Sequence, residues 1–172
     1  MKKLFFIPHV LFFISITFLV TACKKDEEAE GIDKELLDLA SSTSGFTWYK
    51  NSASFLPKSS ASAHPFSYLR TRYNAIASAA LDSNGKVIDS TLFPEGSLVV
   101  KELSNSVGGL DRYAVLLKRS GSPHADSKGW VWGYINKDKS VAEPASKKGA
   151  SCSGCHAQTG NIDYMLMNIA HP

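Results

Sequence analysis

Residues 98–103 read Leu98-Val99-Val100-Lys101-Glu102-Leu103, and two further apolar runs of similar length follow at 113–118 and 130–135. Each run contains β-branched or aromatic residues, and glycine-containing connections separate the three, which is typical of short strands. No long helical segment lies between them. The three runs therefore predict an α+β fold, mainly an antiparallel sheet with a few helices on one side.

Two helices are expected on the amino-terminal side of these strands. The apolar residues between 32 and 40 recur at helical spacing and predict a short amphipathic helix. Apolar residues over 66–81 step by three and four, which predicts a longer helix that ends at the turn residues 82–85. Arg70 and Arg72 lie off its apolar stripe, so both side chains are expected at the surface.

The overall composition is that of one globular domain. The chain has 172 residues, of which 44% are hydrophobic and 20% charged, and this balance argues against global disorder. The formal net charge of +3 is small, and no lysine- and arginine-rich stripe with interleaved aromatic residues is present, which excludes a nucleic-acid partner. Three cysteines are too few for a disulfide-rich scaffold.

The first residues have the pattern of a targeting signal. Lys2 and Lys3 precede an almost continuously apolar run over 4–20, and the run ends in Val20-Thr21-Ala22-Cys23. Small residues before a cysteine predict a lipoprotein signal peptide over 1–22, with the lipid attached to Cys23. A single transmembrane anchor is the alternative, because a run of about 17 residues is at the short limit for crossing a bilayer.

This signal divides the chain and places the protein. Residues 23–31 are expected to form a lipidated polar tether, and residues 32–172 a single folded domain. A lipidated cysteine predicts a bacterial envelope protein anchored to the outer membrane, with the membrane as its first partner.

The chemistry is concentrated near the carboxyl end, in Cys152-Ser153-Gly154-Cys155-His156. A C-x-x-C-H run in an envelope protein predicts covalent attachment of one haem c. Cys152 and Cys155 on one helical turn can reach the two vinyl groups of one porphyrin, and His156 can then bind the iron. Two alternatives remain: a disulfide or redox dithiol, and half of a zinc site, although no second cysteine pair exists.

The residues available for the other side of the iron are few. Only Met165 and Met167 remain as methionines once the signal is removed, and both follow His156 so closely that they are expected to be apolar contacts of the haem. The remaining candidates are His64, His124 and His171, and a lone histidine is more often a surface or structural residue. The sequence therefore predicts an open or water-bound sixth position, which binds small ligands.

Lys101 is the second candidate residue of the site. In a strand it shares one face with Val99 and Leu103, and burying an ammonium group among apolar neighbours is costly. It either extends along the apolar face so that its head reaches water, or it points into the haem pocket.

Several of these segments together resemble the cytochrome P-460 family, which includes the β-type cytochromes c prime. The similarity spans roughly residues 64–172. It rests on Phe93-Pro94-Glu95-Gly96-Ser97 followed by the strand that ends at Lys101-Glu102-Leu103, on Gly129-Trp130-Val131-Trp132-Gly133, and on the haem motif with Asp163-Tyr164 after it.

The resemblance implies a mostly antiparallel fold, a homodimer, and one five-coordinate haem c held by Cys152, Cys155 and His156. In members that oxidise hydroxylamine, a lysine matching Lys101 is cross-linked to the haem. Other members bind nitric oxide or carbon monoxide. The resemblance thus implies a protein that binds or oxidises small nitrogen compounds and passes electrons to a redox carrier, with non-catalytic gas binding or six-coordinate electron transfer as alternatives.

One feature departs from the oxidising members. They carry a carboxylate over the iron, which the resemblance places on the strand matching 113–118, and this stretch contains none. Glu95, Glu102 or Asp111 could take that role only if the fold brings one of them close. An apolar wall favours neutral diatomic ligands over proton-coupled chemistry.

Overall fold

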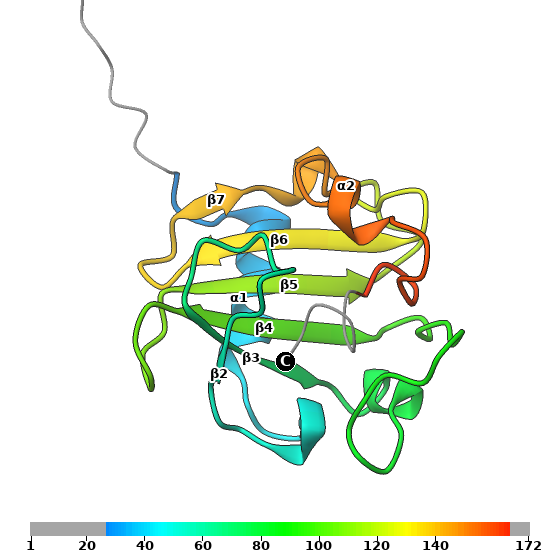
Figure 1. Cartoon of the computed structure of the whole chain (residues 1–172). Coiled ribbons are helices and arrows are strands. Elements are labelled where there is room, and N and C mark those ends of the chain that lie inside the picture. The colour runs from blue at the N-terminus through cyan, green and yellow to red at the C-terminus, as the bar shows by residue number, and fades with distance from the viewer. Residues whose placement is uncertain (1–26, 166–172) are drawn as a thin grey trace, which may run out of the picture.

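The computed structural model describes residues 27–165, and within them seven strands form one antiparallel sheet (Figure 1). The strand order is β1-β3-β4-β5-β6-β7, and the short β2 also pairs with β3. The strands are β1 (Thr47–Trp48), β2 (Leu56–Pro57), β3 (Tyr68–Tyr73), β4 (Leu98–Ser104), β5 (Arg112–Lys118), β6 (Trp130–Asn136) and β7 (Val141–Glu143). The predicted α+β fold class is confirmed, and the three runs named first became β4, β5 and β6.

One face of the sheet forms the main apolar core under α1 (Gly31–Ser41). Leu36 and Ala40 are fully buried there and pack with the inward side chains of the central strands, namely Leu98, Val100, Val115, Leu117, Val131 and Ile135. A Cβ atom at Gly133 would lie 2.8 Å from a methyl carbon of Leu36, so glycine at this position lets the helix approach the sheet. The helix predicted over 32–40 is confirmed.

The second helix does not share that face. α2 (Ser153–His156) lies on the opposite side of the sheet, where its histidine packs against Trp132 of β6. The expectation that the helices cover one side is therefore wrong, because the sheet has an apolar row on each face and each row needs a cover.

The helix predicted over 66–81 is also wrong. Residues 68–73 form β3, which pairs with β4 along its whole length, and only Ala77–Ala80 form a short 3-10 turn. Tyr68-Leu69-Arg70-Thr71-Arg72-Tyr73 fits a period of two as well as a helical period, and its aromatic and β-branched residues favour a strand. Pairing with a central strand decided between the two.

This correction changes the environment of the arginines. Arg72 is fully buried and donates to the carbonyl oxygens of Ala40 and Ser42, and it forms an ion pair with Glu102. Arg70 is half-buried and binds the other oxygen of Glu102 at 2.6 Å. The expectation of two surface arginines is wrong for Arg72, which ties the end of α1 to the sheet.

The last residues of the predicted tether over 23–31 lie against the sheet and α1. Glu28 forms a bridge with Ser140, and Ala29 is buried in the core under α1. Residues 28 and 29, which belong to the predicted tether, thus contact the domain. The predicted signal peptide over 1–22 and Cys23 lie outside the described residues, and none of the helices within 27–165 has the length and apolar character to cross a bilayer.

Candidate functional site

A cavity of about 250 Å³ lies on the face of the sheet opposite α1. Its floor is formed by side chains that alternate with the core residues along each strand, as expected for period-two strands. Its walls come from residues 61–65, from 151–156 and from Met165.

Two rows of cross-strand partners form the floor. The first row runs from Thr71 through Lys101, Ala114 and Tyr134 to Glu143, each paired with the next on the neighbouring strand. The second row brings Val99, Leu116 and Trp132 together in the same way. The first row is polar at several positions, and the second is apolar.

The C-x-x-C-H motif forms one wall. The amide N–H groups of Cys155 and His156 both donate to the carbonyl oxygen of Cys152, at 3.2 and 3.1 Å, so the motif is a single helical turn. Cys152 is half-buried, Cys155 is exposed, and their thiols are not bonded to each other. Burial raises the pKa of the Cys152 thiol, whereas redox-active dithiols have a lowered pKa. This disfavours the dithiol alternative.

The tautomer and the protonation state of His156 are those of a metal-binding histidine. Its Nδ1 lies 2.6 Å from the carbonyl oxygen of Tyr164, and because a carbonyl only accepts, Nδ1 carries the proton and Nε2 is left free. Burial lowers the pKa of His156 to about 4, with a smaller lowering contribution from the charge of Lys101. The imidazole is therefore neutral at pH 7, which is the form that ligates iron.

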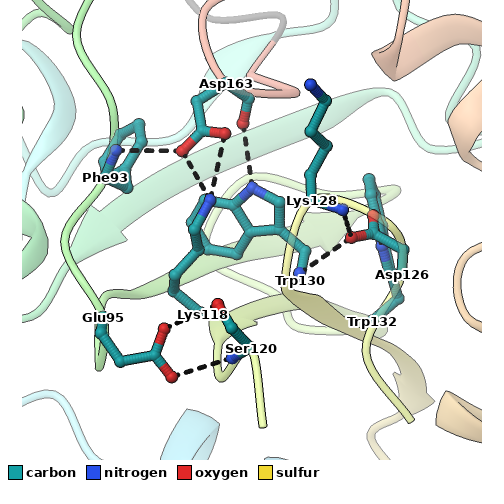
Figure 2. Close-up of polar contacts among 9 residues, drawn as sticks. All are labelled: Phe93, Glu95, Lys118, Ser120, Asp126, Lys128, Trp130, Trp132 and Asp163. Atoms are coloured by element: carbon teal, nitrogen blue, oxygen red, sulfur yellow. Dashed lines mark hydrogen bonds and ion pairs between the residues drawn. The ribbon is translucent and has the colours of Figure 1, made fainter. Parts of the chain in front are cut away.

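The indole ring of Trp132 packs against the imidazole ring of His156. The two rings meet edge to face, with centroids 5.1 Å apart, and the indole Nε1 donates to Asp126 at 2.8 Å (Figure 2). Gly149 lies against the same indole, where an added Cβ would be 2.6 Å from the ring, and its φ of +68° favours glycine. Trp132 of β6 and Gly149 before the motif thus hold the imidazole ring of His156 in position.

Lys101 lies in the middle of the polar row and lines the cavity. Burial lowers its pKa from 10.5 to about 8. Of the two interpretations drawn from the sequence, the structure supports the one in which the lysine points into the pocket.

Glu143 is a cavity residue that the sequence did not indicate. It is the one carboxylate lining the cavity within the described part of the chain. Its Oε2 binds Lys147 at 3.2 Å, while its buried Oε1 has no hydrogen-bond partner among residues 27–165. Only the pairing of β6 with β7, which sets Glu143 opposite Tyr134, brings it there.

The three carboxylates considered earlier lie elsewhere. Glu95 binds Ser120, Glu102 binds the two arginines of β3, and Asp111 accepts from the amide of Asn105. Strand β5 contributes Ala114 and Leu116 to the cavity, so the expected apolar wall is present.

His64, which the sequence offered as one of the candidate sixth ligands, is also a residue of the cavity. It lines the cavity, with Nδ1 3.2 Å from the hydroxyl oxygen of Tyr134. Burial lowers its pKa to about 3, and the charges of Lys101 and His156 contribute in the same direction, so His64 is neutral at pH 7.

The other proposed sixth ligands are placed differently. Met165 is buried and lines the cavity as an apolar contact. His124 is not among the cavity residues and lies near Asp33 of α1. Burial raises the pKa of Asp33, and the charge of His124 opposes that shift. Met167 and His171 lie outside the described residues. No group of three or more histidine, cysteine or acidic side chains within 27–165 is arranged to hold a metal ion.

These residues fit a haem. A neutral imidazole with a free Nε2, two unbonded thiols on the adjacent turn and a largely apolar cavity are the surroundings that a covalently attached porphyrin requires. A family model described as Cytochrome P460 matches residues 47–167. The chain belongs to the cytochrome P460 family. As a member of the cytochrome P460 family it is a haem protein, and the resemblance found in the sequence is confirmed. The curated proteins include no significant match to it.

Proposed function

We propose that the chain is a lipid-anchored, mono-haem c protein of the bacterial cell envelope that binds nitric oxide or hydroxylamine at an open iron position. The observation that carries the proposal is the cavity, which His156 lines together with the small apolar side chains of Val99 and Ala114. When bound, the haem supplies a redox-active iron that takes small nitrogen ligands.

In this proposal the chain holds the cofactor in three ways. The thiols of Cys152 and Cys155 would hold the haem through thioether bonds to its two vinyl groups, Nε2 of His156 would bind the iron, and Lys101 would contact the porphyrin. A bond from Lys101 Nζ to the porphyrin edge would replace one N–H and one C–H, and would need a two-electron oxidant such as peroxide to accept the electrons.

Glu143 extends the proposal from binding to oxidation. Oxidising hydroxylamine removes protons as well as electrons, so a base within reach of the substrate is needed. The unpaired Oε1 of Glu143 supports this role, and the electrons would pass to a carrier protein. Non-catalytic binding of nitric oxide is the second candidate, favoured by the apolar wall of β5.

The test uses the purified haem-loaded protein. We expect an intact mass that contains one haem, a five-coordinate spectrum, and nitric oxide binding. A diacylglyceryl group on Cys23 and a homodimer in solution would support the remaining proposals on anchoring and assembly. A spectrum of Lys101→Ala identical to the wild type would remove the proposed cross-link.

Glu143→Gln separates the two candidate functions. If Glu143 is the base, this variant loses about 100- to 10,000-fold in hydroxylamine oxidation and keeps nitric oxide binding. Glu95→Gln is the matched control, since Glu95 binds Ser120 outside the cavity, and we expect wild-type rates for it. The wild type could instead give a six-coordinate, low-spin spectrum that becomes five-coordinate in His64→Leu. That result would contradict both candidate functions and favour electron transfer.

A further inference from the structure

The contact that orients His156 comes from a strained turn after α2. Ile162 and Met165 exchange backbone hydrogen bonds of 3.1 and 2.7 Å, and the residues between them, Asp163 and Tyr164, have φ values of 44° and 68°. Left-handed backbone is disfavoured for residues with a Cβ atom. The turn therefore needs contacts from outside to keep its shape, and the carbonyl oxygen that meets His156 belongs to it.

Those contacts converge on Asp163. Its carboxylate accepts from the Lys118 ammonium at 2.9 and 3.1 Å and from the amide N–H of Phe93 at 3.0 Å (Figure 2). Its carbonyl oxygen accepts from the indole of Trp130 at 3.1 Å. The Asp163 side chain is 3% exposed and that of Lys118 is 12% exposed, so this is a buried ion pair.

We propose that the Asp163–Lys118 ion pair positions the Tyr164 carbonyl oxygen and, through it, the imidazole that holds the iron. This inference rests on the proposed role of His156 as the iron ligand. Neither Asp163 nor Lys118 lines the cavity, so both act as positioning residues and not as catalytic ones.

The expected effect follows from the chemistry of the Nδ1 hydrogen bond. A short bond from Nδ1 to a carbonyl oxygen makes the imidazole a stronger donor to a metal. When the turn relaxes, that bond lengthens, the donor weakens, and the ferric state is stabilised less. The iron–histidine stretching frequency should then fall and the midpoint potential should rise.

The experiment compares the haem-loaded wild type with Asp163→Asn and Lys118→Met. The readouts are the iron–histidine stretch of the ferrous protein, by resonance Raman spectroscopy, and the midpoint potential. Positioning predicts that both variants move both readouts in the same direction. A purely electrostatic effect predicts opposite shifts of the potential, because one variant removes a negative charge and the other a positive charge.

Two further variants keep the test decisive. Lys118→Arg retains the ion pair and should restore wild-type values. Glu102→Gln weakens a buried ion pair that lies away from His156, so it should lower stability without moving either readout. If Asp163→Asn does not fold, Lys118→Met and Lys118→Arg still decide the question.

The outcomes separate this inference from the proposed function. A wild type with a permanent sixth ligand would contradict the open site, and the midpoint potentials would still decide on positioning. Unchanged readouts in Lys118→Met, or potentials that shift in opposite directions in the two variants, would overturn the inference while leaving the open site intact.

Discussion

Replacing Lys101 with methionine should stabilise the haem-free protein at pH 7, and the gain should disappear as the pH rises. Burial lowers the pKa of Lys101 from 10.5 to about 8. At about 1.4 kcal/mol per pKa unit, this depression corresponds to roughly 3 kcal/mol of unfolding free energy lost by the wild type at neutral pH. Methionine fills a similar volume without a charge.

The pH dependence follows from proton binding in the two states. Below pH 8 the lysine is protonated both folded and unfolded, and the folded state bears the full cost of the buried charge. Between about pH 8 and 10.5 the unfolded state holds more protons, so the stability of the wild type rises with pH. Above that range both states are neutral. The advantage of Lys101→Met is therefore largest at pH 7 and shrinks from pH 8 upward.

Urea unfolding followed by circular dichroism at pH 7, 8, 9 and 10 measures this difference. A Cys152→Ser, Cys155→Ser background prevents covalent haem attachment in every sample. Lys34→Met is the control, because Lys34 is 61% exposed on α1 and should give a small difference that does not depend on pH. A Lys101→Met difference that stays constant from pH 7 to 10 would refute the reasoning and place the ammonium in water.

Two further predictions concern the two faces of the sheet. Gly149→Ala should lower the haem content of the purified protein, because the added Cβ would lie 2.6 Å from the Trp132 ring that packs against His156. The ratio of Soret to 280 nm absorbance measures the haem content, and a wild-type ratio would contradict this prediction. Leu36→Ala should lower the free energy of unfolding by about 2–5 kcal/mol and leave the haem spectrum unchanged, since Leu36 is fully buried on the opposite face. A change in its spectrum would show that the faces are coupled.

Local sequence patterns were sufficient to predict the three central strands and the first helix. The runs at 98–103, 113–118 and 130–135 and the helix over 32–40 are all present. Residues 68–73 could not be assigned in the same way, because their pattern fits both periods. Pairing with β4 makes this segment a strand, and it also allows Arg72 to form an ion pair with Glu102.

The residues of the site differ in the same way, since some belong to a local motif and others are placed by strand pairing. The C-x-x-C-H motif is local, so its cysteines and histidine could be named from the sequence. Glu143 could not be named, and His64 could be named only as one of several candidate ligands. Both reach the cavity beside Tyr134, which strand register sets opposite Glu143 and which lies 70 residues from His64 in the sequence. A polar residue three positions into a short terminal strand carries no signal until that register is known.

The bulge between β6 and β7 gives the hairpin at 137–140 an unusual importance. The register shifts between Tyr134 and Ile135, and this irregularity sets Glu143, not Ala142, against the polar row. Deleting one residue from the hairpin, with the bulge kept, would set Pro144 opposite Tyr134 and remove the carboxylate from the polar row of the cavity. If Glu143 is the base that we propose, the length of this loop decides whether the cavity contains a base at all, with no change to Cys152, Cys155 or His156.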